Sequence, residues 1–215
     1  METMTSAAQD DFATEPVLGL PQHPPAGEDL LWQGRPDSLA LARDAFKINW
    51  IAGYFVALAL WRAAVVANGS VGSVIAVMLP YLVIGLATCA ILYTLAVVQA
   101  RATVYTVTTS RVALRIGAAL TVTLNVPFKQ IGAAHLSAHR NGTGTIALET
   151  LGDTRISYLV CWPHVRPWHF AKTQPALRCI PDAARVAKLL AEAAETRIAE
   201  PIVMRAAPAA ALAAE

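Results

Sequence analysis

The sequence INWIAGYFVALALWRAAVVANGSVGSVIAVMLPYLVIGLATCAILYTLAVVQA, residues 48–100, contains one charged side chain, Arg62, in 53 positions. A turn-like NGS at 68–70 divides it into apolar spans at 48–67 and 71–100. Twenty helical residues rise about 30 Å, which matches the hydrocarbon thickness of a bilayer. We therefore expect a two-helix transmembrane hairpin, with the longer second span tilted or projecting beyond the headgroups.

Basic residues flank both outer ends of this hairpin, three before it and three after it: Arg35, Arg43, Lys47, Arg101, Arg111 and Arg115. The connecting turn contains none. Basic residues near membrane spans are enriched on the cytoplasmic side. The sequence therefore predicts a multi-pass membrane protein with both termini in the cytoplasm.

Alternating periodicity replaces the helical pattern after residue 100, and short β-branched segments are separated by turn signals. We expect six strands after the hairpin: 103–108, 112–116, 121–126, 130–139, 145–149 and 155–160. Asn141-Gly142 is a strong hairpin signal between the fourth and fifth strands. A seventh strand is expected at 29–34. Two antiparallel spans would return the chain to that side of the membrane, where 29–34 could pair with the domain.

The last predicted element is an amphipathic helix over residues 182–198, because Val186, Leu189, Leu190 and Ala193 share one helical face. The whole pattern predicts an integral membrane α+β protein in which a transmembrane hairpin precedes a small antiparallel β-barrel or sandwich closed by this helix. The expected segments are a disordered acidic arm at 1–27, a strand and juxtamembrane segment at 28–47, the hairpin at 48–100, the β domain at 101–198 and an Ala-rich tail at 199–215.

Charge is unevenly distributed along the chain, although the total is only +2. Residues 101–180 carry nine basic and two acidic side chains, a net charge of +7. A basic domain close to the membrane is attracted to anionic lipid headgroups or to an acidic protein. Recognisable nucleic-acid-binding motifs are absent, so we expect no nucleic-acid partner. Small residues at Gly53/Ala57 and Gly85/Cys89 permit close helix contact, either within the hairpin or in a homodimer.

The sequence contains no arrangement typical of catalysis, metal binding or cofactor binding. Cys161, His164, His169 and Cys179 have spacings that match no zinc-ligand pattern that we can justify. No phosphate-binding loop or nucleophile motif is present. We therefore expect a protein that is not an enzyme and has no cofactor.

One tract, CWPHVRPWHF at 161–170, concentrates aromatic, basic and proline residues before the last helix. It allows two interpretations. In the first, the tract is a rigid connection whose tryptophans pack under the β domain. In the second, it is an exposed Trp/Arg surface that binds a partner or the headgroup layer, since Trp and Arg are enriched at interface hot spots and Trp at membrane interfaces.

The stretch YTVT at 105–108, with Arg111-Val112 and Gly117, resembles the bacterial membrane-anchored PH-like domain family. A more specific resemblance, over about residues 27–198, is to the PuhB family of photosynthetic complex assembly proteins of purple bacteria. It is carried by these segments: Gly27-Glu28, LWQGRP (31–36), RIGAAL (115–120), PFKQI (127–131), GTG (142–144), Tyr158-Leu159, WPH (162–164), RPW (166–168) and Pro181-Asp182.

This resemblance implies a non-enzymatic factor, in the bacterial inner (intracytoplasmic) membrane, that binds reaction-centre or core light-harvesting antenna subunits during assembly. The alternative is a generic membrane-tethered PH-like adaptor or anionic-lipid-binding module unrelated to photosynthesis. The resemblance identifies no site residues. Chemistry and position suggest these contacts for partner or lipid: Trp32, Arg35, Arg101, Arg111, Arg115, Lys129, Trp162, His164, Arg166 and Trp168.

Overall fold

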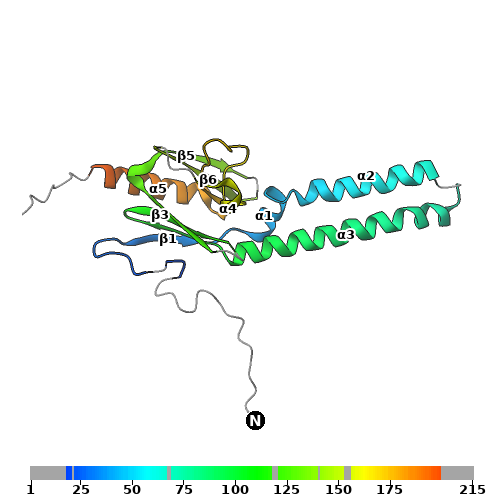
Figure 1. Ribbon diagram of the computed structural model, residues 1–215, viewed down its shortest axis with the longest axis horizontal. Coiled ribbons are helices and arrows are strands. Elements are labelled where there is room, and N and C mark those ends of the chain that lie inside the picture. Colours follow the sequence, from blue (N-terminus) through cyan, green and yellow to red (C-terminus); the bar gives the residue numbers. More distant parts are fainter. Residues whose placement is uncertain are drawn as a thin grey trace, which may run out of the picture.

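The computed structural model describes residues 18–20, 22–66, 69–117, 121–139, 141–152 and 156–199. A long helical hairpin leaves one end of a β domain, and a short helix lies at the junction (Figure 1). The elements in chain order are β1 (Leu30–Gly34), α1 (Ser38–Asp44), α2 (Ile48–Val66), α3 (Val71–Arg101), β2 (Val104–Thr108), β3 (Arg111–Ile116), β4 (Val122–Pro127), η1 (Phe128–Gln130), β5 (Ile131–Ala138), β6 (Thr143–Thr150), α4 (Tyr158–Cys161), β7 (Ala176–Pro181) and α5 (Ala183–Ala199).

The two hairpin helices pack on each other through small residues. A side chain at Gly85 would place its Cβ 2.7 Å from that of Phe55, so glycine permits the close approach of α2 and α3. The residues buried in the hairpin are Ala59, Gly85, Ala96 and Ala100. The large apolar side chains point outward, and only 6% of the most apolar stretch of each helix is buried. Both helices are long and apolar enough to cross a membrane.

The β domain contains two antiparallel sheets, ordered β1-β2-β3-β4 and β5-β6-β7. Their shared core includes Tyr105, Leu114, Phe128, Ile146, Leu148 and Leu177. Helix α5 packs against β5, β6 and η1, and its Val186 and Leu190 are buried in this core, as the predicted apolar face requires. The sheets are open. The expectation of a closed barrel is therefore wrong, whereas that of a small sandwich with a C-terminal helix describes the domain.

Strand β1 confirms the predicted contribution from before the hairpin. It pairs antiparallel with β2, with Leu30 opposite Thr108 and Gly34 opposite Tyr105. Order also begins earlier than expected for a disordered arm at 1–27, because Leu20 is buried and the Gln33 side chain donates a hydrogen bond to the Leu18 carbonyl. Residues 1–17 and 21 of that arm, and 200–215 of the expected tail, lie outside the described residues.

The predicted strand at 155–160 is wrong. Residues 153–155 lie outside the described part of the chain, and Tyr158–Cys161 form the helical turn α4, with Cys161 buried. The last strand is instead β7, which pairs with β6. A short apolar run fits either a strand or a helical turn, and here packing on the core selects the turn.

Candidate functional site

Both connections between the hairpin and the β domain contact the loop that precedes β7, residues 156–175, which includes the helical turn α4. Phe46, two residues before α2, packs edge to face on Trp162, with ring centroids 5.2 Å apart. Thr103, two residues after α3, places its hydroxyl 3.0 Å from His164 Nε2. A second small core, formed by Ala40, Leu41, Ala100 and Cys179, joins α1, the end of α3 and β7. The junction is therefore a packed unit.

His164 is the central polar group of this junction and is 1% exposed. Its Nδ1 lies 2.6 Å from the Tyr105 hydroxyl, which accepts a hydrogen bond from the Arg178 backbone N–H. The Thr103 hydroxyl donates to the Gln99 carbonyl, so it accepts from Nε2. These directions place the single ring proton on Nε2. Burial, assisted by the nearby Arg178 charge, lowers the pKa of His164 to about 3, which keeps the ring neutral.

Arg178 of β7 joins this network to helix α1. Its side chain is buried, donates a hydrogen bond to the Pro163 carbonyl at 3.0 Å and forms an ion pair with Asp44. Partial burial opposes ionisation of Asp44, but the attraction of Arg178, with Lys47 and His139, outweighs it and lowers the pKa of the carboxyl. The ion pair therefore fixes the helix that leads into the hairpin against the last strand of the domain.

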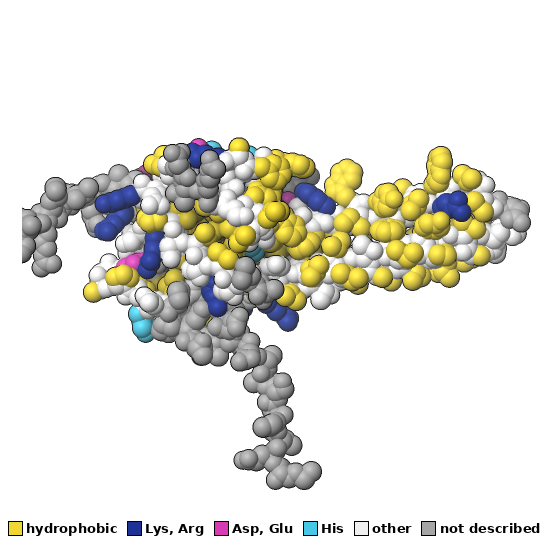
Figure 2. Space-filling view, viewed as in Figure 1, with side chains coloured by type: hydrophobic (Ala, Val, Ile, Leu, Met, Phe, Trp, Pro, Cys, Tyr) yellow, Lys and Arg dark blue, Asp and Glu magenta, His cyan; other side chains and the backbone are white. Residues whose placement is uncertain are grey.

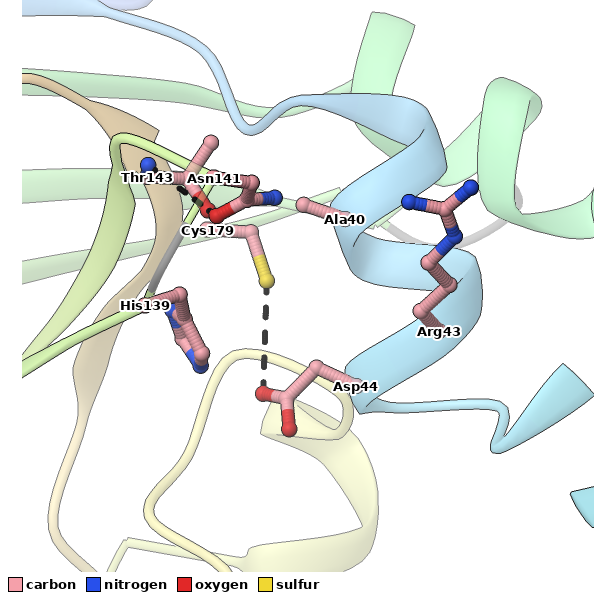
Figure 3. A pocket seen from close by; sticks show the side chains of 7 residues that line it. All are labelled: Ala40, Arg43, Asp44, His139, Asn141, Thr143 and Cys179. Atoms are coloured by element: carbon pink, nitrogen blue, oxygen red, sulfur yellow. Dashed lines mark hydrogen bonds between the residues drawn. The ribbon is translucent and has the colours of Figure 1, made fainter. Parts of the chain in front are cut away.

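A cavity of about 320 Å³ lies beside this ion pair, lined by Ala40, Arg43, Asp44, His139, Asn141, Thr143 and Cys179 (Figure 3). The Cys179 thiol points towards Asp44, with Sγ 4.0 Å from Oδ2. Asn141 Oδ1 accepts from the backbone and the hydroxyl of Thr143. Burial, despite the opposing Arg178 charge, raises the pKa of Cys179 to about 12. The thiol is thus protonated at neutral pH and is not an activated nucleophile.

Apolar side chains gather on the outside of the same loop. Leu159 is 85% exposed, Trp168 84% and Phe170 61%. The Phe170 ring lies 4.5 Å from that of Tyr158 and 6.2 Å from that of Trp168. Figure 2 shows hydrophobic side chains collected on the end of the domain beside the hairpin and continuing along the helices. Of the two interpretations of the 161–170 tract, burial of its tryptophans under the domain is wrong for Trp168.

The comparisons with known proteins fit this architecture. The family described as Bacterial PH domain matches residues 46–194, which include the hairpin, the strands β2 to β7 and most of α5. The chain belongs to the bacterial PH domain family. It is also 46% identical over 199 residues to an uncharacterized 23.7 kDa protein in the puhA 5' region of Rhodobacter capsulatus, covering 91% of this chain and 93% of that protein. No solved structure matches the chain.

Five of the ten predicted contact residues have exposed side chains on this bacterial PH domain and its junction: Arg35, Arg101, Lys129, Trp162 and Trp168. Three others are partly exposed. Trp32 packs against the core, Arg111 forms an ion pair with Glu28, and Arg166 donates a hydrogen bond to Gln174. The side chains of Arg111 and Arg166 are therefore partly engaged in contacts within the domain itself.

Arg115 and His164 are buried, so their prediction as surface contacts is wrong. The physical reason for His164 is its hydrogen bonding to Thr103 and to Tyr105 of β2, which lie about 60 positions earlier in the sequence. Arg115 lies on β3, the strand between β2 and β4, opposite Val104 and Thr123. Sequence reasoning also missed Asp44 and Arg178, which are 134 positions apart.

Within the described residues, no group of three or more His, Cys, Asp or Glu side chains could hold a metal ion. The junction offers an apolar surface, exposed cations and a small polar cavity. These features suit binding to the surface of a membrane or of another protein.

Proposed function

We propose that the chain is a membrane-anchored assembly factor for the photosynthetic reaction centre and core light-harvesting complex, acting by binding subunits and not by catalysis. The observation that carries this proposal is the Rhodobacter capsulatus relative, whose name gives a photosynthesis gene context, the puhA 5' region. Its similarity extends over 91% of this chain, so the hairpin and the β domain are both included.

The geometry supports binding in the plane of the membrane. Helices α2 and α3 present large apolar side chains outward along their length, and Trp50, Val71 and Leu86 are 79%, 76% and 73% exposed. Subunits that assemble within a bilayer can pack against such a surface. With both termini on the cytoplasmic side, as the flanking basic residues predict, the β domain would cover the cytoplasmic face of the same partner.

Exposed cations supply the second part of the proposed surface. Arg35, Arg101 and Lys129 are exposed, and the last two lie within residues 101–180, which carry a net charge of +7. They would attract acidic cytoplasmic segments of a partner and anionic headgroups. This attraction weakens with added salt, because the Debye length is only about 8 Å at physiological ionic strength. Apolar contacts in the membrane plane would persist under the same conditions.

The test is affinity capture of the full chain from photosynthetically growing cells, followed by subunit identification and near-infrared absorption of the captured material. We expect reaction-centre or antenna subunits to be recovered, and a deletion strain to contain less assembled core complex at unchanged pigment synthesis. Capture without these subunits, together with normal core-complex levels in the deletion strain, would reject the proposal and favour the alternative, a PH-like adaptor serving another partner.

A further inference from the structure

We infer that the loop containing Leu159, Trp168 and Phe170 inserts into the interfacial layer of the bilayer that holds α2 and α3, and so forms a third membrane contact. This inference rests on the membrane anchoring in the proposed function. It assigns a role to a surface that neither the hairpin nor the basic side chains explain. Its occupant is lipid at the boundary between headgroups and acyl chains.

The exposure of these three side chains separates them from the rest of the β domain. Among the described residues outside the hairpin, no other large apolar side chain is more than 54% exposed, the value for Leu151. Leu159 at 85%, Trp168 at 84% and Phe170 at 61% instead match the outward-facing residues of α2 and α3. Phe170 contacts both Trp168 and Tyr158, the residue before Leu159. An exposed apolar surface of this kind marks a contact with a membrane or another protein.

The position of the loop favours the membrane. Trp162 packs on Phe46 just before α2, and His164 is hydrogen-bonded to Thr103 just after α3. These contacts hold the loop at the level where both helices leave the domain. The hydrophobic surface there is continuous with the sides of the helices (Figure 2). A bilayer surrounding α2 and α3 therefore ends beside this loop.

The local chemistry also fits an interfacial layer. Trp and Tyr are enriched at the level of the headgroups, where an aromatic body can be buried while polar groups stay hydrated. Arg43 and Arg101 are exposed at the same junction, and Lys47 is 61% exposed even though it pairs with Asp44. Basic residues at this level are attracted to an anionic surface. Phosphate groups would thus lie beside the cations while the apolar side chains reach below them.

Tryptophan fluorescence can test this placement in the full chain. Replacing Trp50 and Trp61, which lie on the outward face of α2, by Phe leaves three emitters: Trp32, Trp162 and Trp168. This variant is reconstituted in vesicles of phosphatidylcholine and phosphatidylglycerol, with or without bromine atoms on the upper acyl chain, which quench nearby indoles. We expect emission to fall in the brominated vesicles.

Two further variants assign the quenching to the loop. Adding Trp162→Phe and Trp168→Phe should abolish it, because Trp32 packs against the domain core. Adding Trp32→Phe instead should preserve the quenching of the remaining emission. Leu159→Glu with Phe170→Glu should reduce quenching while both loop tryptophans remain as reporters. The matched control is Leu136→Glu, because Leu136 is 45% exposed on β5, outside this loop, and it should change nothing.

Carbonate washing of the same vesicles separates the two possible failures. A chain that resists carbonate extraction but shows no quenching would overturn the loop insertion and leave the membrane anchoring intact. That result would assign the loop to water or to a protein partner. Extraction of the chain by carbonate would overturn the anchoring and, with it, the inference.

Discussion

The hairpin and the β domain place their large apolar side chains in opposite positions, outward in the hairpin and inward in the domain. In the domain, Tyr105, Leu114 and Leu148 are fully buried between sheets and helix α5. In the hairpin, small residues face inward, whereas Trp50, Leu86 and Ile91 point outward. A helix that is apolar all round needs surroundings that are also apolar. The domain can therefore be stable through its own core, while the hairpin depends on what surrounds it.

A cavity in the domain core should have the largest effect and should leave the hairpin unaffected. Leu114 on β3 is fully buried. Leu114→Ala should lower the free energy of unfolding of the domain by about 2–5 kcal/mol, the range for buried leucines. Urea-dependent proteolysis of the vesicle-bound chain measures this loss. Carbonate extraction should not change, and Leu136→Ala on the exposed side of β5 should be nearly neutral. Release of Leu114→Ala by carbonate would show that the two regions are not independent.

A charge in the hairpin should weaken membrane insertion and leave the stability of the domain unchanged. Leu86 lies at the middle of α3 and is 73% exposed. Leu86→Arg should disfavour membrane insertion by about 2.5–3.5 kcal/mol, because arginine at the bilayer centre is poorly solvated. The readout is the fraction extracted by carbonate compared with Leu86→Phe. Equal extraction of the two variants would mean that this face of α3 is not in contact with acyl chains.

Acidification should weaken the domain selectively. His164 has a folded pKa of about 3 against an ordinary value of 6.5, so the unfolded chain binds a proton that the folded chain excludes. The stability is fully present above pH 6.5 and is lost as the pH falls towards 3. Between pH 7.5 and 5.5 the loss should be about 1.4 kcal/mol. Residues 48–100 contain no His, Asp or Glu, so the hairpin should not respond.

Urea-dependent proteolysis at the two pH values measures this difference. His135→Asn is the matched control, because the His135 side chain is 46% exposed, and the pH dependence should survive in it. A domain equally stable at pH 7.5 and 5.5 would show that His164 is not held in its neutral form.

The smallest expected effect tests how the N-terminal strand is attached. Arg111 on β3 and Glu28, two residues before β1, form an ion pair of 2.9 Å. A double-mutant cycle of Glu28→Gln and Arg111→Gln should give a coupling energy of about 1 kcal/mol, at the upper end for surface pairs because Glu28 is mostly covered. High salt should reduce it. A coupling energy of zero would mean that the strand pairing alone holds this segment.

Periodicity and turn chemistry identified the hairpin, the early strands and the strand at 29–34, because each of these depends on side chains close together in the sequence. The junction depends on distant ones. In the sequence, Arg178 resembles an ordinary surface cation, but the fold pairs it with Asp44. His164 likewise resembles a surface histidine, but in the structure it is hydrogen-bonded to Tyr105 and Thr103. Burial of polar groups is decided by such partners, so sequence reasoning placed His164 wrongly.

The pairing of β1 with β2 determines when, during synthesis of the chain, the first sheet can fold. Leu30 can pair with Thr108, its partner in the ladder, only after the three helices α1, α2 and α3 between them have been synthesised. At ribosomal speeds this delay is about ten seconds. Membrane insertion of the hairpin during that interval would return the two strands to the same side and shorten the search between them. The bilayer would then act as a folding template for a domain that lies outside it.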